Sequence, residues 1–67
     1  MIDTRGLSCP IPVVMVQDAI RKTGADTMEV LCDARVSVEN ISRLARNSGY
    51  RVSVAEDGPD FRLTLNR

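Results

Sequence analysis

The run Cys9-Pro10-Ile11-Pro12, which comes shortly after Gly6, is the feature that most limits how this 67-residue chain can fold. Proline lacks a backbone N–H and has a fixed φ, so two prolines in one turn do not fit the interior of a helix or a central strand. Both fit the first turn of a helix, where the amides have no intrahelical partner. We therefore predict a flexible turn at Gly6 and a helix capped by Cys9, with both prolines in its first turn.

This placement predicts a reactive thiol at Cys9. The amide end of a helix carries partial positive charge, and helix N-termini are among the environments that favour the thiolate of a cysteine over its thiol. Within the first turn, Ile11 still offers an N–H toward the cap. The alternative is that Cys9 is a small apolar residue that fills a corner of the core, but inert buried cysteines are not usually placed between a glycine turn and two prolines.

Apolar periodicity predicts six elements in the order β-α-β-α-β-β. Alternation, as at Met28 and Val30, indicates strands, whereas apolar residues three or four apart, as at Val13 and Val16, indicate helices. Ser37 is a plausible cap for the second helix. The predicted elements are a strand at 2–4, a helix at 10–22, a strand at 27–33, a helix at 38–48, and strands at 50–55 and 61–66 joined by a turn at 56–60.

Three of these strands have apolar residues on one face and mostly polar residues on the other. In the third strand the apolar face is formed by Tyr50, Val52 and Val54. This pattern predicts that both helices cover the same side of the sheet. The expected fold is a two-layer α/β sandwich of the α+β type, a four-stranded mixed sheet with two helices on one face, in a single domain over 1–67.

Cys32 falls on the apolar face of the second strand, so we predict that it is a core residue. An alternative follows from the topology, because the first two strands of a β-α-β unit run parallel and end side by side. The end of the second strand then lies near the start of the Cys9 loop, and Cys32 could act as a resolving thiol. A Cα separation well above about 7 Å would exclude a disulfide without backbone movement.

Composition excludes several classes of function. Lys+Arg and Asp+Glu each total 9, so no overall charge steers the protein toward nucleic acid or a membrane. The two cysteines, with no histidine in the chain, do not form a zinc site or a disulfide framework, and no cofactor is expected. No apolar run approaches the roughly 20 residues of a membrane span, and the N-terminus does not resemble a signal peptide. We therefore expect a cytoplasmic protein.

The residues Asp3, Arg5-Gly6-Leu7 and Cys9-Pro10-Ile11-Pro12 resemble the signature of the TusA/SirA-like family of small sulfur-carrier proteins. The resemblance covers the whole chain, because the order of the elements and the length beyond the cysteine are also similar. The segment 31–50 is similar to the TusA-like N-terminal domain of YedF-type proteins. Those proteins are linked to selenium metabolism and often carry a second, DsrE-like domain.

The resemblance implies that Cys9 accepts a persulfide sulfur and relays it in a sulfur- or selenium-trafficking pathway. The implied partners are a sulfur donor, such as a cysteine desulfurase or a rhodanese, and a sulfur-acceptor protein. The resemblance leaves two possibilities open: a stand-alone carrier, or a domain that is fused to or paired with a DsrE-like domain. Without a histidine or a paired general base the chain cannot assemble a Cys-His hydrolase, so partners are expected to supply the chemistry. The supporting residues of this site are Asp3, Arg5, Gly6, Pro10, Ile11 and Pro12.

Three alternatives remain at this level. Arg5 either holds the thiolate or persulfide, with Asp3 as its partner, or is a solvated surface charge. Six of the nine basic residues are arginines after residue 34, so a nucleic-acid-binding or regulatory module is the competing function, although zero net charge and two aromatic residues count against it. A thiol redox switch between Cys9 and Cys32 is the third reading.

Overall fold

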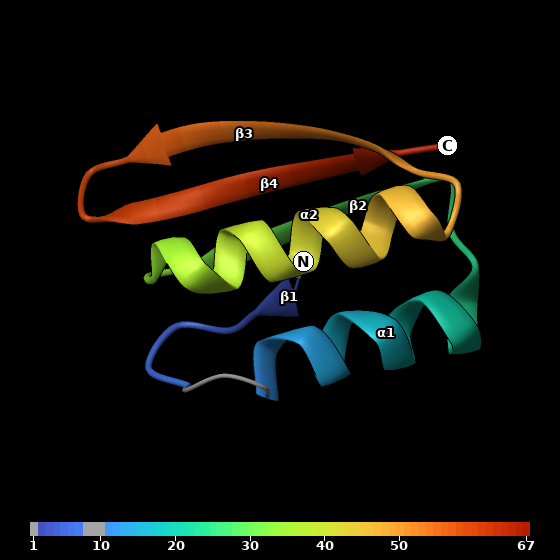
Figure 1. The fold of residues 1–67 in the computed structure, drawn as a ribbon, viewed down its shortest axis with the longest axis horizontal. Helices are drawn as coiled ribbons and strands as arrows, with labels where there is room; N and C mark the ends of the chain where they lie inside the picture. The colour runs from blue at the N-terminus through green and yellow to red at the C-terminus, as the bar shows by residue number, and fades with distance from the viewer. Residues whose placement is uncertain (1, 8–10) are drawn as a thin grey trace.

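The computed structural model describes residues 2–7 and 11–67, which form six elements in the predicted order β-α-β-α-β-β (Figure 1). Cys9 and Pro10, for which the sequence predicts a helix cap and a place in the first turn, lie outside the described residues. The elements are β1 (Ile2–Asp3), α1 (Ile11–Thr23), β2 (Thr27–Cys32), α2 (Arg35–Asn47), β3 (Arg51–Asp57) and β4 (Asp60–Asn66).

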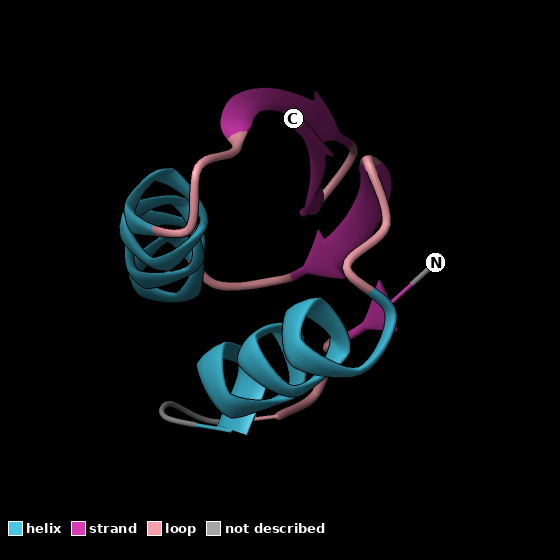
Figure 2. Ribbon diagram, turned by 90° about the vertical axis from the view of Figure 1, so that its right-hand side faces the viewer, coloured by secondary structure: helices cyan, strands magenta, loops and turns pink. Residues whose placement is uncertain are grey.

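The four strands form one mixed sheet in the order β1-β2-β4-β3. β1 is parallel to β2, whereas β4 is antiparallel to both of its neighbours, β2 and β3. Both helices lie on the same side of the sheet, as Figure 2 shows. The predicted two-layer α/β sandwich is therefore confirmed. Within the described ranges neither helix is long and apolar enough to cross a bilayer.

The core lies between the sheet and the two helices. Its most buried members come from β2, β4 and both helices, and they include Val16, Val30, Ile41 and Leu63, each with 0 % of its surface exposed. Val30 on β2 and Leu63 on β4 are direct cross-strand neighbours, so they present their side chains to the helices as a pair. Cys32 belongs to the same cluster, which confirms its prediction as a core residue.

α1 follows its predicted course in the part that is described. Val16 is buried, and Val13, Ala19 and Ile20 pack against the core from the same face. The helix ends where Gly24 adopts a left-handed φ of 56° and its N–H donates to the carbonyl of Ile20 at 3.0 Å. A side chain is disfavoured in that conformation, which explains why glycine stands at the stop.

α2 begins earlier than the sequence pattern predicts. The expected cap at Ser37 is wrong, because the helix starts at Arg35 and Ala34 occupies the cap position in an extended conformation. The carbonyl of Ala34 already accepts the N–H groups of Ser37 and Val38, which places Ser37 inside the first turn, where it is buried. No side chain caps α2, so a serine could mark the start of this helix only approximately.

The β3–β4 hairpin is longer and its turn shorter than predicted. The strands extend to Asp57 and from Asp60, so the turn consists of Gly58 and Pro59 rather than residues 56–60. Gly58 has a φ of 64°, as the first central residue of a tight two-residue hairpin turn requires. The apolar face predicted for β3 is also only partly buried: Tyr50 is buried just before the strand, but Val54 on this edge strand remains 47 % exposed.

Candidate functional site

The predicted site lies at the end of the molecule where β1 and β2 finish and where α1 and α2 begin (Figure 1). The turn between β3 and β4 reaches the same end. Three of the predicted site residues, Asp3, Arg5 and Gly6, lie in or just before the turn that leads toward Cys9. Residues 8–10, which include Cys9 and Pro10, lie outside the described part of the chain.

Arg5 is held by two carboxylates from opposite ends of the sequence. Its Nε donates to Asp3 Oδ1 at 3.0 Å and its Nη2 to Asp3 Oδ2 at 2.9 Å, a bidentate ion pair. Its Nη1 donates to Asp60 Oδ2 at 3.4 Å, which links the turn to the first residue of β4. Arg5 therefore fastens the turn after β1 to the hairpin on the far side of β2.

The electrostatics agree with this geometry. The side-chain hydrogen bonds from Arg5, together with a bond from its backbone N–H, lower the pKa of Asp3 from 3.8 to about 2. The same hydrogen bonds to Asp3 raise the pKa of Arg5 above its already high value. The guanidinium is thus engaged within the turn. A contact between Arg5 and a thiolate or persulfide on Cys9 stays a prediction, because Cys9 is not among the described residues.

Two residues that the sequence reasoning did not single out complete the anchoring of this turn. Asp33, which follows β2, accepts a hydrogen bond from the Gly6 N–H through Oδ2 at 2.8 Å. Thr4 is fully buried and donates twice to the carbonyl of Leu31, through its N–H at 2.8 Å and its hydroxyl at 2.6 Å. Parallel strands bring their carboxyl ends to the same edge, so the position of Asp33 directly after β2 was the available signal.

The described start of α1 has the features expected beneath an anionic group. Its first turn contains no acidic side chain, so the helix itself places no carboxylate on the partial positive charge of its N-terminus. Pro12 is buried, whereas Ile11 is 47 % exposed. The start of the helix is thus fixed on one side by a rigid ring in the core and open to solvent on the other.

The surroundings of Cys32 are not those of a reactive cysteine, which is exposed and has a lowered thiol pKa. It is 1 % exposed and free of any disulfide. Burial raises the pKa of its thiol above the ordinary value of 9.0, and the neighbouring carboxylates of Asp33 and Asp60 add to this effect. The thiolate is the reactive form of cysteine, so these surroundings suppress reactivity at Cys32. Its predicted role as a resolving thiol remains a prediction, because the separation from Cys9 is not defined.

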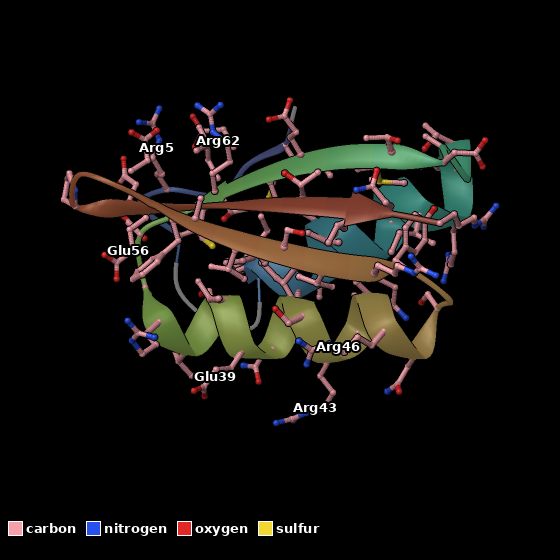
Figure 3. The ribbon with its side chains drawn as sticks, turned by 90° about the horizontal axis from the view of Figure 1, so that it is seen from above. Arg5, Glu39, Arg43, Arg46, Glu56 and Arg62 are labelled. Atoms are coloured by element: carbon pink, nitrogen blue, oxygen red, sulfur yellow. The ribbon has the colours of Figure 1, made fainter. Side chains whose placement is uncertain are left out.

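The arginines of the later part of the chain do not form one basic patch. Arg35 lies 3.9 Å from Glu56, and Arg62 pairs with Glu29 at 3.7 Å and with Asp57 at 3.4 Å. Figure 3 shows Arg43 pointing away from α2 on the opposite side of the molecule from Arg5 and Arg62. This distribution does not provide the continuous positive surface that a nucleic-acid interface uses.

Comparison with known proteins assigns the family. The family model described as "Sulfurtransferase TusA" matches residues 1–67, the whole chain. The chain belongs to the TusA family. This assignment confirms the resemblance drawn from the Cys9-Pro10-Ile11-Pro12 run and its upstream Asp3 and Arg5. Within residues 2–7 and 11–67, no group of three or more His, Cys, Asp or Glu side chains is arranged to hold a metal ion.

The similarity to individual relatives covers nearly the full length of this chain and of each relative. "Putative sulfur carrier protein MJ0990" of Methanocaldococcus jannaschii is 34 % identical over 68 residues, covering 98 % of this chain and 91 % of the relative. "Putative sulfur carrier protein YedF" of Escherichia coli K12 is also 34 % identical, covering 98 % of this chain and 88 % of the relative. The crystal structure of a SirA-like protein from Desulfitobacterium hafniense has a TM-score of 0.84 at 29 % identity, covering 97 % and 92 % of the two chains. This TusA-family chain is therefore similar in sequence to proteins named as putative sulfur carriers and similar in fold to a SirA-like protein.

Proposed function

We propose that this TusA-family protein carries sulfur as a persulfide on Cys9. In the loading step the Cys9 thiolate attacks the terminal sulfur of a donor persulfide. The donor S–S bond breaks, a new S–S bond forms on Cys9, and the donor leaves as a thiolate. In the unloading step a thiolate of the acceptor attacks the outer sulfur of the Cys9 persulfide. The S–S bond on Cys9 breaks, Cys9 leaves as a thiolate, and the acceptor then carries the persulfide. Neither step needs an external oxidant or a general base built into the chain.

The observation that carries this proposal is the contrast between the two cysteines. Cys32 is sealed in the core with a raised pKa, so it cannot meet a protein-bound persulfide without local unfolding. Cys9 instead follows a turn that is fastened through Arg5 and Gly6 and precedes a helix start without acidic residues. A carrier thiol needs access to large partners and a high thiolate fraction, and the second cysteine meets neither requirement.

The partners follow from this chemistry. The donor must itself carry a persulfide, as a cysteine desulfurase or a rhodanese does, and the acceptor must present a thiol. A DsrE-like domain, fused or separate, is one candidate acceptor. The cargo is sulfur, with selenium as the related alternative. We place the protein in the cytoplasm, where thiols are kept reduced and a persulfide can be passed on.

The test uses mass spectrometry on the intact protein after incubation with a cysteine desulfurase and cysteine. The wild type and a Cys32→Ala variant should each gain the mass of one sulfur atom, and a reducing agent should remove it. Cys9→Ser should gain none. Loading of Cys9→Ser to the wild-type level, or loss of loading in Cys32→Ala with its fold intact, would overturn the proposal.

A further inference from the structure

The outer edge of β3 is not paired with a strand of the described chain. β3 stands at the end of the strand order and pairs only with β4, so no strand in the described part of the chain covers its other edge (Figure 2). Such an edge presents unpaired N–H and C=O groups, which proteins usually shield with a short strand, a proline, a lysine or a bulge. β3 has seven residues, none of them proline or lysine, and its register with β4 is continuous. The other edge strand, β1, has two residues.

The inner face of β3 is also left partly bare. Val54 is in register with Leu63 on β4, which in turn is in register with Val30 on β2. The latter two side chains are 0 % exposed, whereas Val54 at the edge is 47 % exposed. A valine on the core side of an edge strand, aligned with two buried neighbours, indicates that further apolar surface can be buried beside it.

We propose that β3 is the interface of a symmetric homodimer. In this dimer β3 pairs antiparallel with β3 of a second copy, and Val54 lies opposite its counterpart. This register pairs all seven residues of the strand, and it brings Arg51 of each copy opposite Asp57 of the other. Opposite charges that face each other across an antiparallel pair stabilise it. The strand is therefore complementary to itself in charge as well as in length.

The charges select this register over its neighbours. Residues that lie directly opposite each other across an antiparallel pair point to the same side of the sheet. The twofold axis must therefore lie between the two copies of one residue, here Val54, and not between two neighbouring residues. Moving the axis by one residue, to Ser53 or Ala55, removes both Arg51–Asp57 pairs. Arg51 has no ion pair with another described residue in the single copy, and Asp57 is exposed, with Arg62 as its neighbour at 3.4 Å. Both groups are therefore accessible to a second copy.

The dimer would leave the candidate sulfur site free. A twofold axis perpendicular to the sheet joins the two sheets edge to edge and keeps all helices on one face. The turn that contains Arg5 and Gly6 lies beside β1 and β2, away from the β3 edge, and the antiparallel arrangement places the two turns at opposite ends of the joined sheet. The inference does not depend on the proposed role of Cys9, and its failure would not affect that role.

Charge reversal tests both the dimer and its register. Sedimentation equilibrium of the wild type, up to about 1 mM protein to allow for a small interface, should show a monomer–dimer equilibrium. Arg51→Asp puts a carboxylate opposite Asp57, and Asp57→Arg puts a guanidinium opposite Arg51, so each variant alone should associate at least about tenfold more weakly. Mixed in equal amounts, the two variants should form a heterodimer, because both cross-strand pairs then join opposite charges.

Three outcomes of these measurements would refute the β3–β3 pairing. A wild type that stays monomeric throughout, or a mixture that associates no better than either variant alone, would refute the β3–β3 pairing. Unchanged association of both single variants would also refute it, since another surface would then hold the copies together. Circular dichroism checks that each variant is folded, and sulfur loading on Cys9 in Arg51→Asp should equal the wild-type level.

Discussion

The hydrogen bond between Gly6 and Asp33 gives the sharpest test of how the fold positions the Cys9 segment. The N–H of Gly6 donates to a carboxylate oxygen at 2.8 Å, and Asp33 is exposed. A charge-assisted bond in such a position contributes about 1 kcal/mol, less than a buried one would. Removing the acceptor by Asp33→Ala should lower the ratio of held to released turns about fivefold.

If sulfur exchange at Cys9 proceeds from the held turn, its rate should fall by up to the same factor. Asp33→Asn is the matched control, because it removes the same negative charge but keeps an oxygen that can accept from Gly6. The rate constant of Cys9 with a chromogenic aromatic disulfide, measured in a Cys32→Ala background, reports the effect, and urea unfolding reports stability. Equal reaction rates of the alanine and asparagine variants would contradict the proposed role of the Gly6–Asp33 hydrogen bond.

Two further predictions concern the core. Leu63→Ala removes a fully buried side chain from the centre of the sheet and should lower the free energy of unfolding by about 2–5 kcal/mol in urea denaturation. Val54→Ala, in the same cross-strand row but half exposed, should lower it by less than about 1 kcal/mol. Equal losses would contradict the assigned burial. The Cys32 thiol has a raised pKa, so above about pH 9 it stays protonated in the folded state while the unfolded chain ionises. The free energy of unfolding should therefore fall as the pH rises beyond this value. The fall should be smaller in the Cys9→Ser/Cys32→Val double variant than in Cys9→Ser alone. An identical pH profile for these two variants would show that Cys32 is not buried as described.

The fold could be predicted because each element carries its own periodic signal. Met28, Val30 and Cys32 alternate on one strand, and Val13 and Val16 share one helical face, so element type and layer order follow from local sequence. What the pattern missed depends on packing between elements. A central and an edge strand have the same alternation, so the sequence did not show that β3 would lie at the edge and leave Val54 exposed.

The candidate site shows the same division. The glycine turn and the two prolines mark the Cys9 segment locally, and Asp3 could be paired with Arg5 because the two are close in sequence. Asp33 and Asp60 could not be found in this way, since each reaches the turn from a distant strand end. Asp33 had only the indirect signal of its place directly after β2, and the role of Asp60 becomes visible only when strand order and register are known.

Asp33 and Asp60 also bear on the reactivity that we propose for Cys9. Around the described turn, the carboxylates of Asp3, Asp33 and Asp60 stand against the single guanidinium of Arg5, which is already engaged by two of them. The side chains of this end therefore carry an excess of negative charge, and that charge contributes to the raised pKa of Cys32. For the thiolate that we propose on Cys9, the amide end of α1 is a source of stabilisation that these carboxylates do not already engage. The first turn of α1 contains no acidic residue, so it leaves that end of the helix available to the proposed carrier residue.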